Sequence, residues 1–262
     1  TAAFVLTLDA VNFGSGWFPL LRKRPGMSGY FTIAASLKER FEKAGAPSAG
    51  ELAALTAEDC AAIFGQIDAP APIQALMDRF AASLRDLGRL VGDRYDGRFL
   101  NLVEAADGSA ERFARSLIEL PSFQDVARYG GRDVPFYKRA QLTVADLHLA
   151  FGGAGPDRFA DLDRLTIFAD NVVPHVLRVD GILRYDANLA ARIDREELIP
   201  AGSAEEIEIR ACAIDACERI VALLRPAEPE ITAQRLDYLL WNRGRQPIYK
   251  ARPRHRARSL FY

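Results

Sequence analysis

The spacing of apolar residues constrains this chain more than any other feature, because they recur every three or four positions and rarely alternate with polar residues. Steps of three and four place side chains on one face of an α-helix. The longest series begins just after Pro72 and therefore predicts a long amphipathic helix. Its apolar positions are Ile73, Leu76, Met77, Phe80, Leu84, Leu87, Leu90 and Val91.

Other segments combine the same spacing with signals for helix starts. Ser203 is followed three positions later by Glu206, which predicts a capping box, and an apolar stripe then runs to Leu224 before Pro226. We predict an all-α, compact helical fold. The shorter predicted helices are Ala57–Phe64, Ala110–Ile118, Arg139–Phe151, Phe159–Ala169, Leu189–Leu198 and Thr232–Trp241.

A length of 262 residues permits either one large domain, 1–262, or two lobes that share a core. The glycine pair Gly130-Gly131 would place the lobe boundary so that the lobes are 1–131 and 132–262. A hydrophobic fraction of 49% with 26% charged residues is typical of globular proteins, so extended disorder is not expected.

The charge balance argues against a protein whose main task is to grip a nucleic-acid backbone. Lys and Arg number 34 and Asp and Glu 35, for a net charge of −1, whereas such proteins carry a strong basic excess. The basic tail Arg252–Arg258 could be an RNA-binding arm, but its apolar end, Leu260-Phe261-Tyr262, favours a tail docked on the body, with one arginine reaching a phosphate.

No apolar run approaches the ~18 residues of a membrane span, and Thr1–Val11 lacks the pattern of a signal peptide. The three cysteines, Cys60, Cys212 and Cys217, form no CxxC pair, so we expect them to be reduced and the protein to be cytoplasmic. The histidines form no HExxH pair, and no Gly-rich nucleotide or phosphate loop is present. We therefore expect neither a metal nor a cofactor.

Four segments set polar groups among aromatic residues, which is unusual for core packing, and they resemble the queuosine 5′-phosphate N-glycosylase/hydrolase family, also called the queuosine salvage proteins. The resemblance covers nearly the whole chain, and Lys138 precedes Asp170 by 32 positions, as in the family. The four segments are Leu8–Trp17, Phe136–Asp146, Leu165–His175 and Leu236–Asn242. The further motifs are Gly29-Tyr30-Phe31, Phe123-Gln124-Asp125, Phe168-Ala169-Asp170, Glu206–Arg210 and Asp237–Trp241.

The resemblance implies hydrolysis of the N-glycosidic bond of queuosine 5′-monophosphate. The products would be queuine, a 7-deazaguanine base, and ribose 5-phosphate, in salvage of a modified tRNA base. It also implies an architecture similar to helical DNA glycosylases, a small nucleotide as the binding partner, and no nucleic acid or membrane partner. Two alternatives stay open at this point: an N-glycosylase acting on a polynucleotide, and a helical nucleotide- or RNA-binding module without catalysis.

The match to Phe-Ala-Asp makes Asp170 the candidate catalytic residue. Cleavage of a ribosyl C–N bond builds positive charge on C1′ and the ring oxygen, and a carboxylate beneath the sugar stabilises or attacks that cation. The residues do not distinguish these two roles. The alternative for Asp170 is a helix cap before Val172–Pro174. Phe168 would form a wall for the base.

Asp237, Tyr238 and Trp241 share one helical turn, and the resemblance points to them as base-binding. Queuine carries an amine that is cationic at neutral pH, which suits an acidic group backed by aromatic rings. The alternative is an amphipathic surface helix whose Trp241 plugs the core. Asn242 departs from the acidic residue that the family has at this position.

Lys138 and Arg139 are adjacent on a predicted helix, so only one can face a pocket. We choose Lys138 as the contact to the 5′-phosphate, with Asp146, two turns further on, orienting it. The alternative is an exposed basic pair and a solvated Asp146.

Asn12 and Phe13 are predicted to contribute to the pocket wall, whereas Asp9 is equally consistent with a helix cap. His175 departs from the glutamine of the family pattern. Its imidazole could position water or phosphate, or it could be a satisfied structural residue. The oligomeric state stays open.

Overall fold

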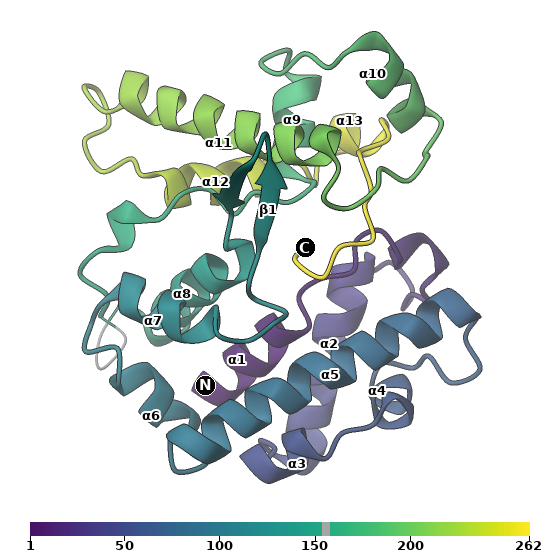
Figure 1. Cartoon of the computed structure of the whole chain (residues 1–262), viewed down its shortest axis with the longest axis vertical. Coiled ribbons are helices and arrows are strands. Elements are labelled where there is room, and N and C mark those ends of the chain that lie inside the picture. The colour runs from purple at the N-terminus through teal and green to yellow at the C-terminus, as the bar shows by residue number, and fades with distance from the viewer. Residues whose placement is uncertain (154–157) are drawn as a thin grey trace.

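Helices make up nearly all regular structure in the computed structural model, which describes residues 1–153 and 158–262. The all-α prediction is confirmed. Figure 1 shows two layers of helices, with the C-terminal tail entering between them. The first layer holds α1 (Ala2–Ala10), η1 (Phe18–Leu20), α2 (Gly29–Ala44), α3 (Ala49–Ala53), α4 (Ala57–Ile63), α5 (Ala71–Arg94), α6 (Phe99–Glu104), α7 (Ala110–Leu117) and α8 (Lys138–Phe151). The second layer holds α9 (Val173–Val179), α10 (Ala187–Asp194), α11 (Ala204–Leu224), α12 (Ala233–Arg243) and α13 (Pro247–Lys250).

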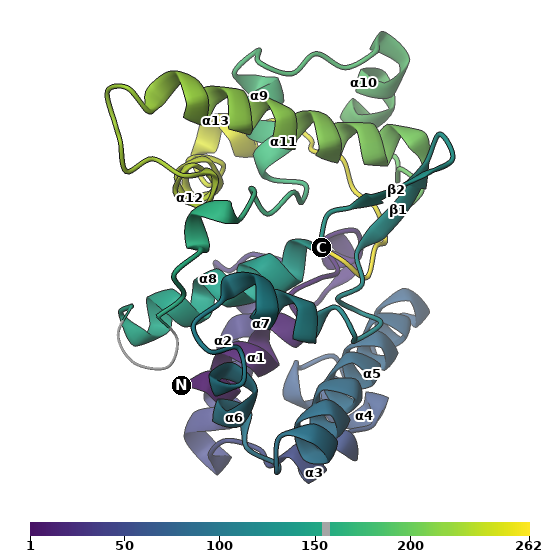
Figure 2. The same ribbon diagram turned by 60° about the vertical axis from the view of Figure 1, so that its left-hand side comes forward.

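The long predicted helix is α5, which runs through the first layer (Figure 2) and buries its apolar stripe in the larger core. Gly88 lies where α5 meets α3. A Cβ at this position would lie 2.5 Å from the backbone nitrogen of Ala53, so only glycine permits this close packing. The apolar face of the helix therefore organises the first layer.

The second layer packs around a separate core, to which α9, α11 and α12 contribute. The side chain of Ser203 accepts a hydrogen bond from the backbone N–H of Glu206, as the capping signal predicts. The reciprocal half of the box is not formed, because Glu206 accepts from Gly202 instead of Ser203. The shorter predicted helices are observed, with shifted ends, as α4, α7, α8, α10 and α12.

The predicted helix Phe159–Ala169 is wrong. This segment contains only the short turn η2 (Leu162–Arg164). Side chains from distant elements bind the backbone of this segment. Gln141 accepts a hydrogen bond from the N–H of Thr166, and Asp237 accepts one from the N–H of Phe168. Tertiary hydrogen bonds thus replace those that a helix would make.

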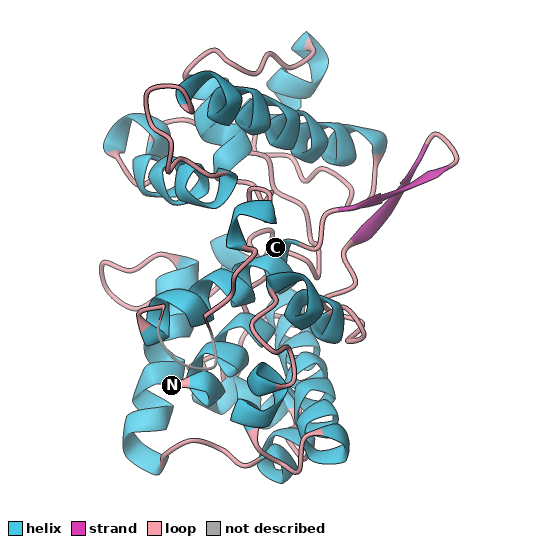
Figure 3. Ribbon diagram, turned by 90° about the vertical axis from the view of Figure 1, so that its left-hand side faces the viewer, coloured by secondary structure: helices cyan, strands magenta, loops and turns pink. Residues whose placement is uncertain are grey.

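A β-hairpin is present that the helical pattern did not predict. Strands β1 (Val126–Tyr129) and β2 (Arg132–Pro135) pair antiparallel and project from the body in Figure 3. Gly130 and Gly131 both have positive φ, at 54° and 79°, as a tight two-residue hairpin turn requires. The glycine pair is therefore a turn between two strands.

The C-terminal tail docks on the body, as predicted. His255 and Tyr262 are buried, and the backbone N–H of Gly14 donates to the carbonyl oxygen of Tyr262 at 3.0 Å. A Cβ on Gly16 would lie 2.3 Å from the carbonyl oxygen of Ala257, so this glycine admits the tail. The tail joins the loop after α1 to the second layer.

The division into lobes at Gly131 stays a prediction. The buried residues of α8, which follows Gly131, belong to the larger core, whereas Phe136 belongs to the smaller one. Within residues 1–153 and 158–262, no helix has the length and apolar character needed to cross a membrane.

Candidate active site

A cavity of about 810 Å³ lies where the tail, the start of α8, α12 and the loop after α1 meet. Every residue that the sequence analysis selected as a site residue lines it. These are Asn12, Phe13, Lys138, Asp146, Phe168, Asp170, His175, Asp237, Tyr238 and Trp241. Residues from four separate segments are therefore brought together in one chamber.

Lys138 begins α8 and is 5% exposed. Its backbone N–H donates to Asp125 Oδ2 at 3.2 Å, whereas its Nζ has no hydrogen-bond or ion-pair partner among the described residues. Burial lowers the pKa of Lys138, although the charges of Asp170 and Asp9 oppose this effect. The ammonium group is therefore available to an anionic ligand.

Arg139 points away from the cavity. It is fully buried, and its guanidinium lies between the rings of Phe13 and Phe123, at 4.6 and 4.5 Å from their centroids. It donates to backbone carbonyls, including those of Asp9 and Ala10 at the end of α1. Burial lowers its pKa to about 9. Arg139 thus holds the loop that carries Asn12 and Phe13.

Asp170 uses one oxygen for the backbone. Its Oδ1 accepts from the N–H of Val172 at 2.6 Å and from that of Val173 at 3.4 Å, where α9 starts. No described residue donates to Oδ2. The capping alternative therefore accounts for Oδ1 only, and Oδ2 is available to a ligand in the cavity.

Asp237 is 4% exposed, which contradicts the alternative of a solvated surface position. Its Oδ2 accepts from the backbone N–H of Phe168 at 2.8 Å. Burial and the charge of Asp170 raise the pKa of Asp237 well above its usual value. Phe168 in turn meets Tyr238 edge to face, with ring centroids 6.2 Å apart.

Asp146 does not hold Lys138 as predicted. It accepts a hydrogen bond from the hydroxyl of Tyr238 at 3.2 Å, and no ion pair to Lys138 forms in the described part of the chain. Burial raises the pKa of Asp146 to about 6. The reason is geometric, because α12 supplies a hydroxyl to Asp146 that the sequence spacing cannot reveal.

Asp9 is a residue whose place the sequence analysis missed. It lies near the end of α1, fully buried, so its interpretation as a helix cap is wrong. Asn12 Nδ2 donates to its Oδ1 at 3.4 Å, and its Oδ2 has no partner within the described residues. Burial and the charge of Asp146 raise its pKa well above its usual value. The polar–aromatic segment Leu8–Trp17 was the available signal.

His175 Nε2 lies 2.8 Å from the carbonyl oxygen of Tyr249. Burial lowers the pKa of His175, so the neutral imidazole is favoured. This bond anchors α13 to α9, as expected of a structural histidine, while the residue also lines the cavity.

An aromatic group closes one side of the chamber between α2 and α12. Tyr30 and Phe31 each lie 6.2 Å from Trp241 in edge-to-face arrangements, and the guanidinium of Arg245 lies 5.0 Å from the centroid of Phe31. Because Trp241 keeps accessible surface in the cavity, it is not a core plug. Tyr30 and Phe31 were noted as a motif but had no assigned role.

Basic side chains gather at the same cavity, several of them from the tail. Arg254 and Asp170 both line the cavity, and the negative charge of Asp170 favours the protonated form of Arg254. The chamber therefore combines carboxyl groups with a cationic lining, an arrangement that suits a ligand with both a cationic and an anionic end. The lining cations besides Lys138 are Lys23, Arg245, Lys250, Arg252, Arg254 and Arg256.

No group of three or more His, Cys, Asp and Glu side chains in residues 1–153 and 158–262 has an arrangement that could hold a metal ion. The cysteines are free thiols: Cys60 and Cys217 are buried and Cys212 is exposed.

The model of the queuosine salvage protein family matches residues 1–262. A queuosine 5′-phosphate N-glycosylase/hydrolase from Sphaerobacter thermophilus is 42% identical over 268 residues, covering 100% of this chain and 81% of that protein. The protein of the same name from Mus musculus is 32% identical over 247 residues, with 90% and 72% covered. The one from Dictyostelium discoideum is 30% identical over 268 residues, with 100% and 78% covered.

Proposed function

The chain belongs to the queuosine salvage protein family, and on that premise we propose that it hydrolyses the N-glycosidic bond of queuosine 5′-phosphate. The products are queuine and ribose 5-phosphate, in salvage of the modified tRNA base. One observation supports the assignment of the site above all others. Asp170 has one oxygen fixed by backbone amides and the other without a partner among the described residues, in a cavity that Lys138 also lines.

The reaction breaks the bond between C1′ and the base nitrogen, whose electron pair leaves with the base. Water then bonds to C1′ and gives up one proton. The departing base takes up one proton at its nitrogen, so the products are neutral at these two positions. Positive charge grows on the sugar before water has bonded, so a fixed carboxylate lowers the barrier. Asp170 takes this role, and Phe168 forms a wall for the base.

Queuine has carbon in place of N7, so the departing base cannot take a proton there. Its departure depends more heavily on stabilisation of the sugar cation and on hydrogen bonds at other edges of the base. Loss of the Asp170 carboxylate should therefore reduce turnover far more than binding.

Carboxyl groups in the cavity also suit the cationic amine of the base. Asp237 has a raised pKa, so binding of an ammonium group and ionisation of this carboxyl are linked. Tyr238 and Trp241 supply the aromatic faces. We assign Lys138 and Arg254 to the 5′-phosphate, because the charge of Asp170 acts on the pKa of both and both therefore lie near it.

The substrate is a free nucleotide, and the proposed site of action is the cytosol, where thiols such as the three free cysteines stay reduced. Neither a polynucleotide nor a membrane is needed for this chemistry.

The deciding experiment incubates the protein separately with queuosine 5′-monophosphate, with the unphosphorylated nucleoside and with queuosine-modified tRNA. Mass spectrometry then measures free queuine. We expect release from the monophosphate and much less from the nucleoside. Release from intact tRNA alone would instead favour a polynucleotide glycosylase, and tight binding without release would favour a binding module.

A further inference from the structure

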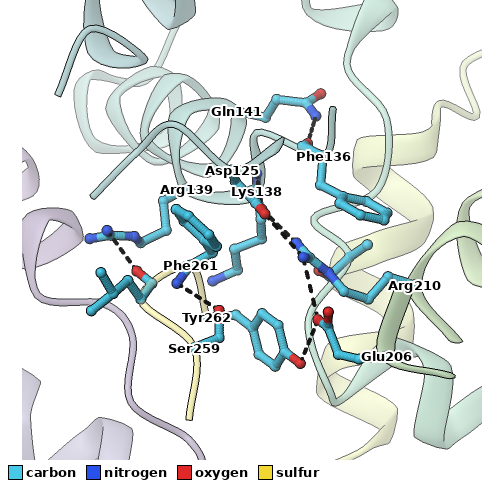
Figure 4. Close-up of polar contacts among 12 residues, drawn as sticks. Asp125, Phe136, Lys138, Arg139, Gln141, Glu206, Arg210, Ser259, Phe261 and Tyr262 are labelled. Carbon is cyan, nitrogen blue, oxygen red and sulfur yellow. Dashed lines mark hydrogen bonds and ion pairs between the residues drawn. The ribbon is translucent and has the colours of Figure 1, made fainter. Parts of the chain in front are cut away.

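Two motifs of the sequence, Phe123-Gln124-Asp125 and Glu206–Arg210, meet in the interior beside the cavity. Arg210 is 1% exposed and Glu206 2%, and neither lines the chamber. Figure 4 shows Arg210 between Asp125 and Glu206, with Tyr262 beside Glu206. Because desolvation offsets much of the attraction within a buried ion pair, stability alone does not explain these charges.

Arg210 uses both ends of its guanidinium. Nη1 and Nη2 donate to the two carboxylate oxygens of Asp125, at 3.0 and 2.5 Å. Nε donates to the carbonyl oxygen of Ala169 at 2.9 Å. The guanidinium is also stacked on Phe136, 3.9 Å from its ring centroid. Its position is therefore fixed from several sides.

Two of these contacts, those to Ala169 and Asp125, lie next to residues of the candidate active site. Ala169 directly precedes Asp170. Asp125 Oδ2 accepts the backbone N–H of Lys138, and the carbonyl oxygen of Asp125 accepts from Tyr137. Tyr137 has φ of 47°, a left-handed conformation that costs energy for a residue with a Cβ. The hydrogen bonds to Asp125 hold the start of α8 in that geometry.

Asp170 and Lys138 come from segments that each lie between the two cores, since Phe168 belongs to the larger core and Phe136 to the smaller one. The buried residues of α8 belong to the larger core, whereas Ala169 belongs to the smaller one. One guanidinium therefore connects the backbones of the two segments. Gln141 on α8 also binds Thr166, four residues before Asp170, so the Arg210 contacts are a second link, and this one ends directly at Ala169 and at the start of α8.

The same network includes the tail. Glu206 Oε1 lies 3.5 Å from Arg210 Nη1 and accepts a hydrogen bond from the Tyr262 hydroxyl at 2.8 Å. Tyr262 also accepts, through its carbonyl oxygen, from Gly14, which follows the cavity residues Asn12 and Phe13. Three separate parts of the cavity wall thus depend on one buried cluster.

We propose that Arg210 is a positioning residue of the active site, which sets the separation between the Asp170 carboxylate and the Lys138 ammonium through Ala169 and Asp125. This inference rests on the proposed function for its catalytic consequence, but its geometric part stands without it.

The test is Arg210→Lys. A lysine keeps the positive charge between Asp125 and Glu206, but its single nitrogen cannot donate at once to Ala169 and to both oxygens of Asp125. We expect kcat for queuosine 5′-monophosphate to fall roughly 10- to 100-fold with KM changed by less than about threefold, because a displacement of about 1 Å is enough for such a loss. A role in stability alone would lower the melting temperature and leave kcat unchanged.

The matched control is Arg192→Lys, since Arg192 on α10 binds both oxygens of Glu205 but lies outside the cavity. Its kcat and KM should match the wild-type values. If Arg210→Lys does not fold, the double variant Asp125→Asn/Arg210→Gln removes both charges together and answers the same question. Wild-type kcat in the folded variant would overturn the proposal.

A crystal structure of Arg210→Lys separates this inference from the proposed function. We expect the Asp170 carboxyl to move relative to Lys138 Nζ by about 1 Å or more. An unchanged separation would refute the positioning role even if the wild-type protein is active. A wild-type protein that releases no queuine from any substrate would count against the proposed function only.

Discussion

At Asp170, a single carboxylate has two kinds of neighbour: backbone amides on one oxygen and the cavity on the other. The backbone contacts fix the side chain, so it need not be ordered when substrate binds. Asp146 and Asp237 show the associated cost, because burial raises their pKa and so disfavours their charged forms. In their ionised forms these two carboxyl groups therefore lower the stability of the fold.

The first prediction concerns Asp170→Asn. Asparagine keeps the oxygen that accepts from Val172 and Val173, so the fold should be preserved, but it removes the negative charge. We expect kcat for queuosine 5′-monophosphate to fall by roughly 100-fold or more with little change in KM.

The matched control is Asp186→Asn, because Asp186 caps α10 through the same pair of backbone contacts and lies outside the cavity. Its kinetic constants should be unchanged. Near-normal turnover in Asp170→Asn would refute the assigned role.

The second prediction concerns the stability of Asp146→Asn. Burial raises the pKa of Asp146 from 3.8 to about 6, so the folded state binds its proton more tightly than the unfolded chain does. The ionised group therefore destabilises the fold by up to about 3 kcal/mol at pH 7, and this penalty shrinks as the pH falls through 6. Asparagine removes the charge and can still accept from Tyr238.

Urea unfolding at pH 7 and pH 5 measures the effect. We expect the variant to be more stable than the wild type at pH 7, by a margin that is about half as large at pH 5. Equal stability at both pH values would contradict a buried, ionised Asp146.

At the scale of elements, the C-terminal tail has a larger role than its basic composition indicates. It runs between the two layers, supplies arginines to the cavity and passes within contact of Gly16. His255 within it is buried, and neither ring nitrogen has a partner among the residues that the structure describes. Arg210, Arg254, Arg178 and His175 all oppose its protonation.

The third prediction follows for the pH dependence of stability. Burial lowers the pKa of His255 from 6.5 to about 3, so only the unfolded chain takes up this proton between those values. The contribution of His255 to stability is therefore complete above pH 6.5 and is lost as the pH falls towards 3. Between pH 7 and pH 5 the loss amounts to about 2 kcal/mol.

His255→Leu removes the titrating group and puts an apolar side chain in its place. Chemical unfolding at pH 7 and pH 5 should show a smaller loss for the variant than for the wild type, by about that amount. The same pH dependence in both proteins would show that His255 is not buried in its neutral form.

At the scale of the whole molecule, the net charge of −1 conceals a concentration of charged groups of both signs at one cavity. Carboxyl groups and cations both face one chamber, and several of the cations come from the tail. Charges in a cleft raise the local concentration of an oppositely charged ligand, and salt screens this effect.

The fourth prediction is a dependence on ionic strength that only the phosphorylated substrate shows. Between about 0.05 and 0.5 M salt, kcat/KM for queuosine 5′-monophosphate should fall roughly three- to tenfold. The nucleoside, which lacks the phosphate, is the control and should change by less than about twofold. Steady-state kinetics over a salt series decides, and equal slopes for both substrates would contradict electrostatic attraction to this cavity.

The helices were predictable where apolar spacing was long and start signals were clear, as in α5 and α11. The segment Phe159–Ala169 was not, because its backbone is bound by Gln141 and Asp237, which come from distant parts of the chain. The hairpin at Gly130-Gly131 was missed because its strands are short and largely exposed, so they carry little alternation.

The sequence by itself determined the helical class, the docked tail and, through the family resemblance, ten of the residues that share the cavity, because these depend on local spacing and on motifs that lie within short segments. Only the tertiary structure decided which oxygen of Asp170 is bound by backbone amides, that Asp146 binds Tyr238 and that Arg210 connects Ala169 to Asp125. These are contacts between segments far apart in the chain. Their partners are set by how two cores pack around one chamber, which no local pattern encodes.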